Sequence, residues 1–477
     1  MASMTATTGA TRLLKRKRKP VDWEKDFYKN GYPKEVIVID DSPTPPPHHN
    51  ASSSSSSSSN GPTIHTPAYG SQMQHYPSSS SSTHYHTAAL QGPTLHPDEI
   101  LHSLKKRRKE LQALPAAASL SGHLLAHDKS AVAIATKQAH APYDDKDGHL
   151  IMQPNDYLTA RYKVMRMLGQ GTFGKVVECY DRVRRTFCAI KVIRAIPKYR
   201  EASKIEIRVL TTLKERDPLN LHKCIHLLEW FDYRNHICMV FELLGQSVFD
   251  FLKSNEFKPF PSTHIQHFAK QLLTSVAFLH DLKLIHTDLK PENILLVSQT
   301  CHMDNKSRVL DNTEIRLIDF GSATFEQDYH ASVVCTRHYR APEIILGSGW
   351  SYPCDIWSVG CILVELFTGE ALFHTHENLE HLALMEACLG KIPAHVSRPA
   401  ATFAQKYFKN SILRYPDAKT TRQSREFVAK MKTLNHLITP DTPMNVEFRD
   451  LISKMLVYDA KERITAREAL RHSFFTL

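Results

Sequence analysis

A glycine-rich segment between two β-rich runs constrains the fold more than any other feature of this 477-residue chain. The segment reads Gly169-Gln170-Gly171-Thr172-Phe173-Gly174 and follows alternating apolar residues that begin near Tyr162. The next runs, 175–180 and 186–193, are again strand-like and are separated by a polar turn. A dinucleotide-binding fold uses similar glycine spacing but continues into a helix. The sequence therefore predicts a β-hairpin flap.

A lysine and a glutamate follow this flap at positions that suit a phosphate-binding role. Glycines let the backbone approach phosphates, and Lys191, 17 residues past Gly174 (191 − 174), can reach them as a point charge. The segment 198–214 is helical in composition, and Glu206 lies on its apolar side. We expect an ion pair between Lys191 and Glu206. Taken alone, Glu206 could equally be a solvated helix carboxylate.

A second group of motifs follows in a fixed order. The apolar run 237–241 precedes Glu242-Leu243-Leu244-Gly245, a linker whose free backbone groups suit the edge of an adenine. Next come His286-Thr287-Asp288-Leu289-Lys290-Pro291-Glu292-Asn293, then Asp319-Phe320-Gly321 after an apolar strand, and then Ala341-Pro342-Glu343. Each motif is modest evidence alone, but chance occurrence of all of them in this order is negligible.

Four polar side chains in these motifs have the chemistry that phosphoryl transfer needs, which is mostly positioning and charge neutralisation. Asp288 would orient the attacking hydroxyl and accept its proton, and Lys290 would neutralise the transferring phosphoryl group. Asn293 and Asp319 supply hard oxygen atoms of the kind that Mg²⁺ prefers.

Two further acids are expected to support the structure around these motifs. We expect Glu343 to pair with Arg463 and so to tie this region to a late helix. Asp355 opens an apolar helix over 356–367, where it can cap amides of that helix or of the catalytic loop.

Taken together, the motifs make the chain resemble a eukaryotic protein kinase over residues 157–475. The resemblance implies an α+β, two-lobed fold, with ATP and Mg²⁺ held between the lobes. The small lobe, about 157–241, would be an antiparallel sheet with one main helix, and the large lobe, about 246–475, would be mostly helical. The resemblance assigns catalysis to Lys191, Glu206, Asp288 and Lys290, and metal binding to Asn293 and Asp319. The nucleotide-binding residues it implies are Gly169, Gly171, Gly174, Val176, Ala189, Lys191, Glu242, Leu244, Asn293 and Asp319.

Within the kinases, the chain resembles the CMGC group and its LAMMER, or CDC-like, family. Thr336-Arg337-His338-Tyr339-Arg340 before the Ala-Pro-Glu motif is similar to CMGC kinases. The segment 380–390 resembles the E-H-L-A-M-M-E-R motif, from which it departs at Leu384 and Ala387. The offset of 26 positions from Asn293 to Asp319 (319 − 293) leaves room for the β-hairpin insert of that family, through 301–312.

The family resemblance also implies a substrate class. It implies phosphorylation of Ser and Thr with autophosphorylation on Tyr, and substrates of the Arg/Ser-rich splicing-factor type. Glu292 could read a substrate arginine through a bidentate pair, and Thr336 is a second candidate for substrate recognition.

Thr287 stands where most kinases have arginine in the H-R-D motif. Such an arginine clamps a phosphorylated activation loop through charge-assisted hydrogen bonds. Threonine cannot form this clamp. Our hypothesis is that the enzyme is active without obligatory phosphorylation of the activation loop.

Residues 1–156 differ in composition from the rest of the chain. They contain the serine runs 52–59 and 78–82, a proline cluster near Pro45 and many histidines, a composition that cannot offset the entropy of ordering. We therefore expect a mostly disordered tail, with a short amphipathic helix near 101–114. Deleting residues 1–150 should spare activity on peptides but alter location.

Two clusters of five cations in this tail, 15–19 and 105–109, favour binding of import receptors and a nuclear location, with shuttling to the cytoplasm open. A solvated or nonspecific polyanion-binding patch is the alternative. The β-branched run Val36–Ile39, followed by acids, resembles a SUMO-interacting motif, although chance or docking on the chain itself would also account for it.

Composition and motif counts exclude or weaken several other classes. No run of 18 apolar residues is present, and nine scattered Cys without a C-x-x-C pair argue against a disulfide scaffold or a zinc module. The sequence favours a soluble intracellular protein. Residues 1–156 carry 17 basic and 14 acidic residues, a net of +3 of the total +11, so the global charge does not mark the tail as a nucleic-acid-binding arm. No nucleic-acid reader module is recognisable, so no sequence-specific nucleic-acid binding is expected. A pseudokinase scaffold is the main alternative to an active kinase.

Overall fold

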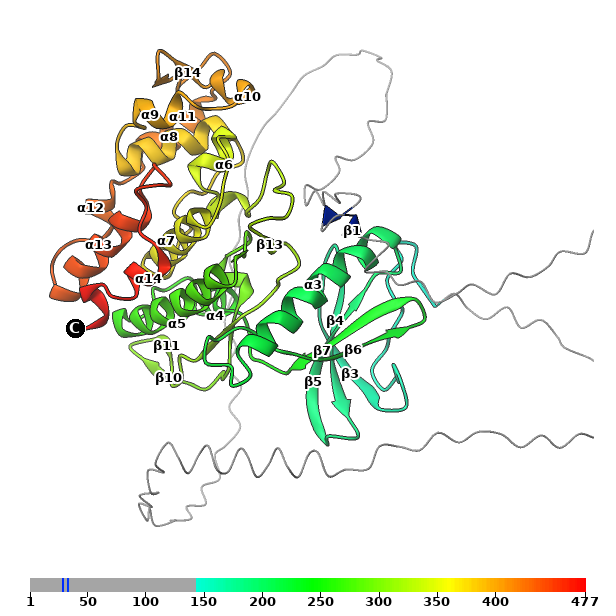
Figure 1. The fold of residues 1–477 in the computed structure, drawn as a ribbon. Helices are drawn as coiled ribbons and strands as arrows, with labels where there is room; N and C mark the ends of the chain where they lie inside the picture. Colours follow the sequence, from blue (N-terminus) through cyan, green and yellow to red (C-terminus); the bar gives the residue numbers. More distant parts are fainter. Residues whose placement is uncertain (1–27, 30–31, 34–142) are drawn as a thin grey trace, which may run out of the picture. The chain divides into compact units, whose positions relative to one another are not determined.

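The computed structural model describes residues 28–29, 32–33 and 143–477. Two short strands, β1 (Tyr28–Lys29) and β2 (Tyr32–Pro33), pair antiparallel in the first part. From residue 143 the chain forms a β-sheet part and a larger helical part (Figure 1). Several features of the N-terminal sequence lie outside the described residues. They are the serine runs, the two cation clusters, the helix predicted near 101–114 and the Val36–Ile39 motif.

The small lobe is a five-stranded antiparallel sheet in the order β3-β4-β5-β7-β6. The strands are β3 (Tyr162–Gln170), β4 (Gly174–Asp181), β5 (Thr186–Ile193), β6 (Leu227–Tyr233) and β7 (His236–Glu242). One long helix, α3 (Pro197–Arg216), connects β5 to β6 and carries a proline in its first turn, where the missing N–H costs no hydrogen bond. The β3–β4 hairpin contains the glycine segment, so the predicted flap is confirmed.

The sheet is apolar on both faces because alternate residues of its strands are buried on opposite sides. Cys188, Ile190 and Val192 of β5 join a smaller core that also contains Leu150. The other face contributes Met239 and further residues to a larger core, which continues through the helical lobe. The smaller core therefore depends on chain that precedes the sheet.

The large lobe is built around α5 (Ser262–Asp281) and α7 (Pro353–Thr368). Every residue of α7 from Cys354 to Leu366 is buried, so the predicted apolar helix over 356–367 is confirmed. The other helices are α4 (Val248–Ser254), η1 (Pro291–Asn293), η2 (Arg337–Tyr339), α6 (Pro342–Leu346), α8 (Asn378–Leu389), α9 (Ala394–Ser397), α10 (Thr402–Gln405), α11 (Arg422–Ala429), α12 (Leu434–Leu437), α13 (Pro443–Met455), α14 (Ala466–Ala469) and η3 (Ser473–Phe475).

Four strand pairs complete the large lobe. They are β8 (Leu284–Ile285) with β13 (Thr324–Phe325), β9 (Ile294–Leu296) with β12 (Ile315–Leu317), β10 (Cys301–Asp304) with β11 (Ser307–Leu310), and β14 (Phe408–Lys409) with β15 (Ile412–Leu413). The β10–β11 pair is the hairpin insert expected through 301–312. Its two-residue turn, Asn305 and Lys306, has φ values of 44° and 66°, which match the twist of a tight hairpin.

The folded part, as the structure describes it, begins before the predicted boundary at Tyr157. His149 and Leu150 are 5% and 2% exposed, and Leu150 belongs to the smaller core. The predicted 1–156 tail therefore ends too late, because a polar composition hid a short segment that contributes only a few buried side chains. Within the described ranges, the structure contains no helix long and apolar enough to span a membrane.

Candidate active site

A lysine between two carboxylates marks the junction of the lobes. Lys191 Nζ lies 2.7 Å from Glu206 Oε1 and 3.2 Å from Asp319 Oδ1. Lys191 comes from β5, Glu206 from α3, and Asp319 from the loop after β12. The predicted Lys191–Glu206 pair is therefore confirmed, and Asp319 joins it from the other lobe.

The charges of this trio follow from burial and mutual attraction. Burial alone would lower the pKa of Lys191, but the carboxylates of Asp319 and Glu206 raise it above its ordinary value. The positive charge of Lys191 lowers the pKa of Asp319, whereas burial raises the pKa of Glu206. Lys191 is thus a fixed cation, and Asp319 a fixed anion, at the lobe junction.

The register of the sheet places the glycine hairpin beside this lysine. Val176 pairs with Lys191, which in turn pairs with Met239, so these three residues form a row across β4, β5 and β7. Gly174 begins β4, and a Cβ atom there would lie 2.2 Å from Val192 O. Only glycine fits this close approach, which fixes the hairpin against β5.

The second catalytic group gathers around Asp288. Lys290 Nζ lies 2.8 Å from Asp288 Oδ2, and Thr336 Oγ1 donates to Asp288 Oδ1 at 2.6 Å. Lys290 Nζ also donates to Thr336 Oγ1 at 3.2 Å. Burial opposes the charge of Lys290, but Asp288 raises its pKa. The structure thus shows a carboxylate that accepts a hydroxyl hydrogen bond beside a lysine, the arrangement expected for a group that orients an attacking hydroxyl.

Asn293 and Asp319 leave the same end of a strand pair. Leu317 of β12 pairs with Ile294 of β9, and Ile318 N donates to Asn293 O at 2.9 Å. Asn293 Nδ2 donates to Asp288 O at 2.9 Å, so its Oδ1 is the atom available to a cation. An amide oxygen and an ionised carboxylate at one site are a donor set that fits Mg²⁺.

Asp355 anchors the catalytic loop through hydrogen bonds from two of its backbone amides. Its side chain is fully buried and accepts hydrogen bonds from His286 N at 2.9 Å and Thr287 N at 3.0 Å. Thr287 has a φ of 65°, a conformation rare for a β-branched residue, and its Oγ1 donates to Ser322 O at 2.8 Å. Of the two capping roles weighed for Asp355, the structure therefore shows the one toward the catalytic loop.

A cavity of about 200 Å³ lies between these groups. Its lining includes Lys191, Glu206, Asp288, Lys290 and Asp319 from the prediction. It also includes residues that sequence reasoning missed: Thr172, Phe173, Ile193, Tyr199, Ala202, Ser203, Gly321 and Ser322. Three of these, at positions 199, 202 and 203, precede Glu206 at helical spacing on α3, so the periodicity around Glu206 could have found them.

Several predicted nucleotide-binding residues do not line this cavity. Glu242 Oε1 lies 3.5 Å from Arg316 Nε at the linker between the lobes. Glu292, the residue predicted to recognise a substrate arginine, also lies outside the lining and is exposed on η1. The remaining residues outside the lining are Gly169, Gly171, Gly174, Val176, Ala189, Leu244 and Asn293. Their proposed contacts with a nucleotide stay predictions.

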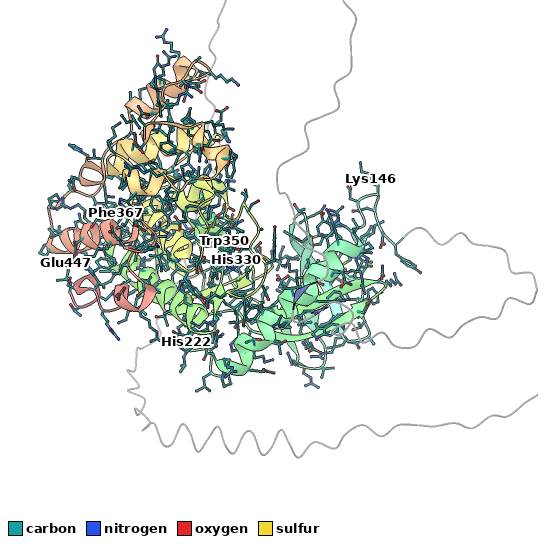
Figure 2. All side chains as sticks on the ribbon, turned by 45° about the horizontal axis from the view of Figure 1, so that its top comes forward. Lys146, His222, His330, Trp350, Phe367 and Glu447 are labelled. Carbon is teal, nitrogen blue, oxygen red and sulfur yellow. The ribbon has the colours of Figure 1, made fainter. Side chains whose placement is uncertain are left out.

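The activation segment is anchored by a ring stack and a hydrogen bond to its backbone as well as by an ion pair. The His330 ring stacks on Trp350 with centroids 4.3 Å apart, and Trp350 Nε1 donates to Ala331 O at 2.8 Å; Figure 2 labels this stacked pair. At the end of the segment, Glu343 forms a bidentate pair with Arg463 at 2.8 and 2.9 Å, as predicted. These contacts require no phosphate group.

Comparison with known proteins identifies the family. The protein kinase domain model matches residues 162–475. The chain belongs to the protein kinase family. It is 55% identical over 341 residues to the dual specificity protein kinase lkh1 of Schizosaccharomyces pombe. The aligned region covers 70% of this chain and 49% of lkh1. This chain therefore spans about half the length of lkh1.

Other relatives are covered more fully. Serine/threonine-protein kinase AFC3 of Arabidopsis thaliana is 50% identical over 345 residues, 70% of this chain and 86% of AFC3. Dual specificity protein kinase CLK2 of Mus musculus is 46% identical over 347 residues, 71% of this chain and 69% of CLK2. A solved kinase-domain structure aligns with a TM-score of 0.65 at 34% identity and covers 69% of this chain and 100% of its own.

These matches confirm the two-lobed kinase fold and the LAMMER resemblance, and favour an active kinase over a pseudokinase. The LAMMER-like segment forms α8, where His381, Leu382 and Met385 are buried. Glu380 of this segment accepts hydrogen bonds from Thr375 Oγ1 at 2.7 Å and from Ser424 Oγ, which links α8 to α11. Leu382 and Met385 thus pack into the core from α8, whereas Glu386 and Leu389, which follow at helical spacing, are only half-buried.

Proposed function

We propose that this kinase transfers the γ-phosphoryl group of ATP to Ser and Thr hydroxyls of Arg/Ser-rich nuclear proteins, and to its own Tyr residues. The observation that carries the proposal is the convergence of Lys191, Asp319, Asp288 and Lys290 on one cavity. Mg²⁺, when bound, would neutralise charge on the phosphates, and Asn293 Oδ1 and Asp319 would hold it.

The chain's own residues account for each proton and charge of the transfer. The substrate hydroxyl oxygen forms the new P–O bond, the bond to ADP breaks, and the hydroxyl proton passes to Asp288. Thr336 Oγ1 already donates to Asp288 at 2.6 Å, which supports the view that this carboxylate can hold a hydroxyl. Lys290 and Lys191 supply fixed positive charge to the phosphoryl group and to the nucleotide phosphates.

An in vitro assay with radiolabelled ATP, Mg²⁺ and a positional peptide library tests the proposal. We expect label to enter Ser and Thr peptides with the wild-type chain and not with Asp288→Ala. Label that enters equally with both proteins would refute the role of Asp288. Nucleotide binding without any transfer would support the pseudokinase alternative instead.

The preference for arginine rests on acidic groups near the catalytic loop. Glu292 is exposed on η1, where it interacts electrostatically with Lys290, which is paired with Asp288, and with the carboxylates of Asp288 and Asp250. A cluster of carboxylates favours a cationic peptide even though the whole chain is basic. Glu292→Lys should weaken Arg-rich peptides selectively. An unchanged peptide preference would exclude this role.

Activity without a phosphorylated activation loop is a further part of the proposal. Thr287 stands where most kinases have the arginine that clamps a phosphorylated activation loop, and it cannot form that clamp. The stack of His330 on Trp350 supports the activation segment without a phosphate group. Phosphatase treatment of the purified protein should leave peptide kinase activity largely intact. A near-total loss of activity would contradict the idea.

The nuclear location and tail partners rest on sequence alone. The cation clusters 15–19 and 105–109 would bind import receptors. Replacing both clusters with alanine in a fluorescent fusion should move the protein to the cytoplasm, and an unchanged nuclear signal would refute import through them. Binding of Val36–Ile39 to SUMO is tested by titrating labelled tail peptide, where unchanged amide shifts would remove it.

A further inference from the structure

A short segment before the first strand of the sheet contacts the parts of the small lobe that form the nucleotide site. We name residues 143–152 the N-terminal strap. The strap closes on itself, since Asp144 bridges to Leu150 and Ile151 N donates to Tyr143 O at 2.8 Å. It reaches three places: the start of β4, the end of β5 and the residues that lead into α3.

The first contact buries a lysine of the glycine hairpin. Lys175 follows Gly174, is 8% exposed, and lies on the outer face of the sheet, where it pairs with Val192. Its Nζ donates to Leu150 O at 3.0 Å and lies 3.5 Å from Asp145 Oδ2. Within the described part of the chain, the polar partners of this buried ammonium are Leu150 O and Asp145, both in the strap, so undocking the strap would leave its charge uncompensated.

The second contact joins the strap to the tip of the glycine hairpin through one side chain. Arg194 Nε donates to Asp147 O of the strap at 2.7 Å, and Arg194 Nη1 donates to Thr172 O at 2.9 Å. The backbone of Arg194 also donates to Phe173 O at 3.0 Å. Thr172 and Phe173 both line the cavity between the lobes.

The third contact reaches α3, the helix that carries Glu206. Arg194 Cζ lies 5.0 Å from the centre of the Tyr199 ring, and the Phe173 ring packs edge-on against Tyr199 at 5.7 Å. Ala195 N donates to Gly148 O at 2.9 Å just before this helix begins. The strap is fixed at its other end by Asp144, which lies 3.0 Å from the buried His236 ring.

We propose that the strap positions the ATP-binding half of the active site, and that Arg194 is the residue through which it acts. A docked strap orients the Arg194 guanidinium, which then holds the hairpin tip over the cavity and packs on Tyr199. An undocked strap would release the tip and expose Lys175. This inference rests on the proposed function, because the hairpin matters only if it covers the phosphates of ATP.

Three substitutions in the full-length chain test the proposal. Arg194→Ala removes the link and Arg194→Lys keeps only a charge near Tyr199. Gly148→Ala strains the strap itself, since Gly148 has a φ of 77° and a Cβ there would lie 3.1 Å from Ile196 Cγ1. The matched control is Lys146→Ala, an exposed strap residue at the outer edge of the small lobe in Figure 2.

We expect Arg194→Ala and Gly148→Ala to raise KM for ATP by about fivefold or more, with KM for the peptide within about twofold of wild type. Arg194→Lys should lie between Arg194→Ala and wild type, and Lys146→Ala should match wild type. Amide hydrogen exchange should become faster across 171–176 in Arg194→Ala and in Gly148→Ala, and should stay unchanged in the control Lys146→Ala.

The opposite results would overturn the inference. An unchanged KM for ATP in both variants, or equal increases in KM for ATP and for the peptide, would reduce the strap to a general support of the fold. If the wild-type chain transfers no phosphoryl group at all, the proposed function fails. Hydrogen exchange of the hairpin then still decides whether the strap holds it.

Discussion

Removing one partner of the buried ion pair between Glu343 and Arg463 should strongly destabilise the large lobe. The two side chains are 6% and 0% exposed and form two hydrogen bonds with each other. Arg463 also donates to Pro353 O at 2.7 Å and to Val457 O at 3.0 Å. Arg463→Met removes all four hydrogen bonds and leaves a carboxylate in the core.

The magnitude follows from the unpaired charge. Breaking a buried pair from one side typically costs about 3–5 kcal/mol, a large part of the 5–15 kcal/mol by which domains are usually stable. The carbonyl groups of Pro353 and Val457 lose their donor in both variants, at about 1–3 kcal/mol each, but only Arg463→Met also leaves a buried, unpaired carboxylate, which Glu343→Leu/Arg463→Met removes. We therefore expect the double variant to be more stable than Arg463→Met.

Urea unfolding followed by tryptophan fluorescence measures both variants, since Trp350 and Trp357 lie in this lobe. The matched control is Arg422→Ala, whose exposed pair with Glu426 should contribute only about 0.3–0.5 kcal/mol. A loss below about 1 kcal/mol for Arg463→Met would refute the reasoning. So would a double variant less stable than Arg463→Met.

Three further predictions concern catalysis, pH and the chain boundary. Asp288→Asn should lower kcat by at least about 100-fold in a peptide assay while its melting temperature stays near that of wild type, and retained turnover would contradict the role of Asp288. Burial raises the pKa of Glu365 to about 7, even though Tyr339 Oη donates a hydrogen bond to it at 2.7 Å. Between the ordinary pKa of a glutamate and pH 7, the folded state therefore binds more protons than the unfolded state. The free energy of unfolding should therefore fall by about 3 kcal/mol from pH 4.5 to 7. Urea unfolding midpoints of Glu365→Gln, measured over the same pH range, should fall less steeply with pH than those of wild type. Equal pH dependence of the two proteins would contradict the role of Glu365. Deleting residues 1–142 should preserve peptide phosphorylation, whereas deleting residues 1–152 should impair it. This revises the sequence-based expectation that a chain without residues 1–150 keeps its activity. Equal activity of the two truncated proteins would show that the strap is dispensable.

The catalytic groups could be predicted because their motifs are local in the sequence. Asp288, Lys290 and Asn293 lie within six residues, and their identities alone indicate a base, a cation and a metal ligand. The Lys191–Glu206 and Glu343–Arg463 pairs join distant segments. Each could still be predicted, since a charge on an apolar helix side or beside a buried motif needs a partner.

The strap and its contacts were decided by the tertiary structure. The groups that bind Lys175 and Arg194 there include the backbone carbonyls of Leu150, Asp147 and Thr172, which any residue could supply. Such contacts leave no residue pattern, so a polar composition placed the boundary after the strap. The hydroxyl of Thr336 on Asp288 likewise depends on how the activation segment folds back across 48 residues. The sequence determines which side chains can perform the chemistry, and the folded backbone decides what holds them in place, because backbone groups carry no sequence signal.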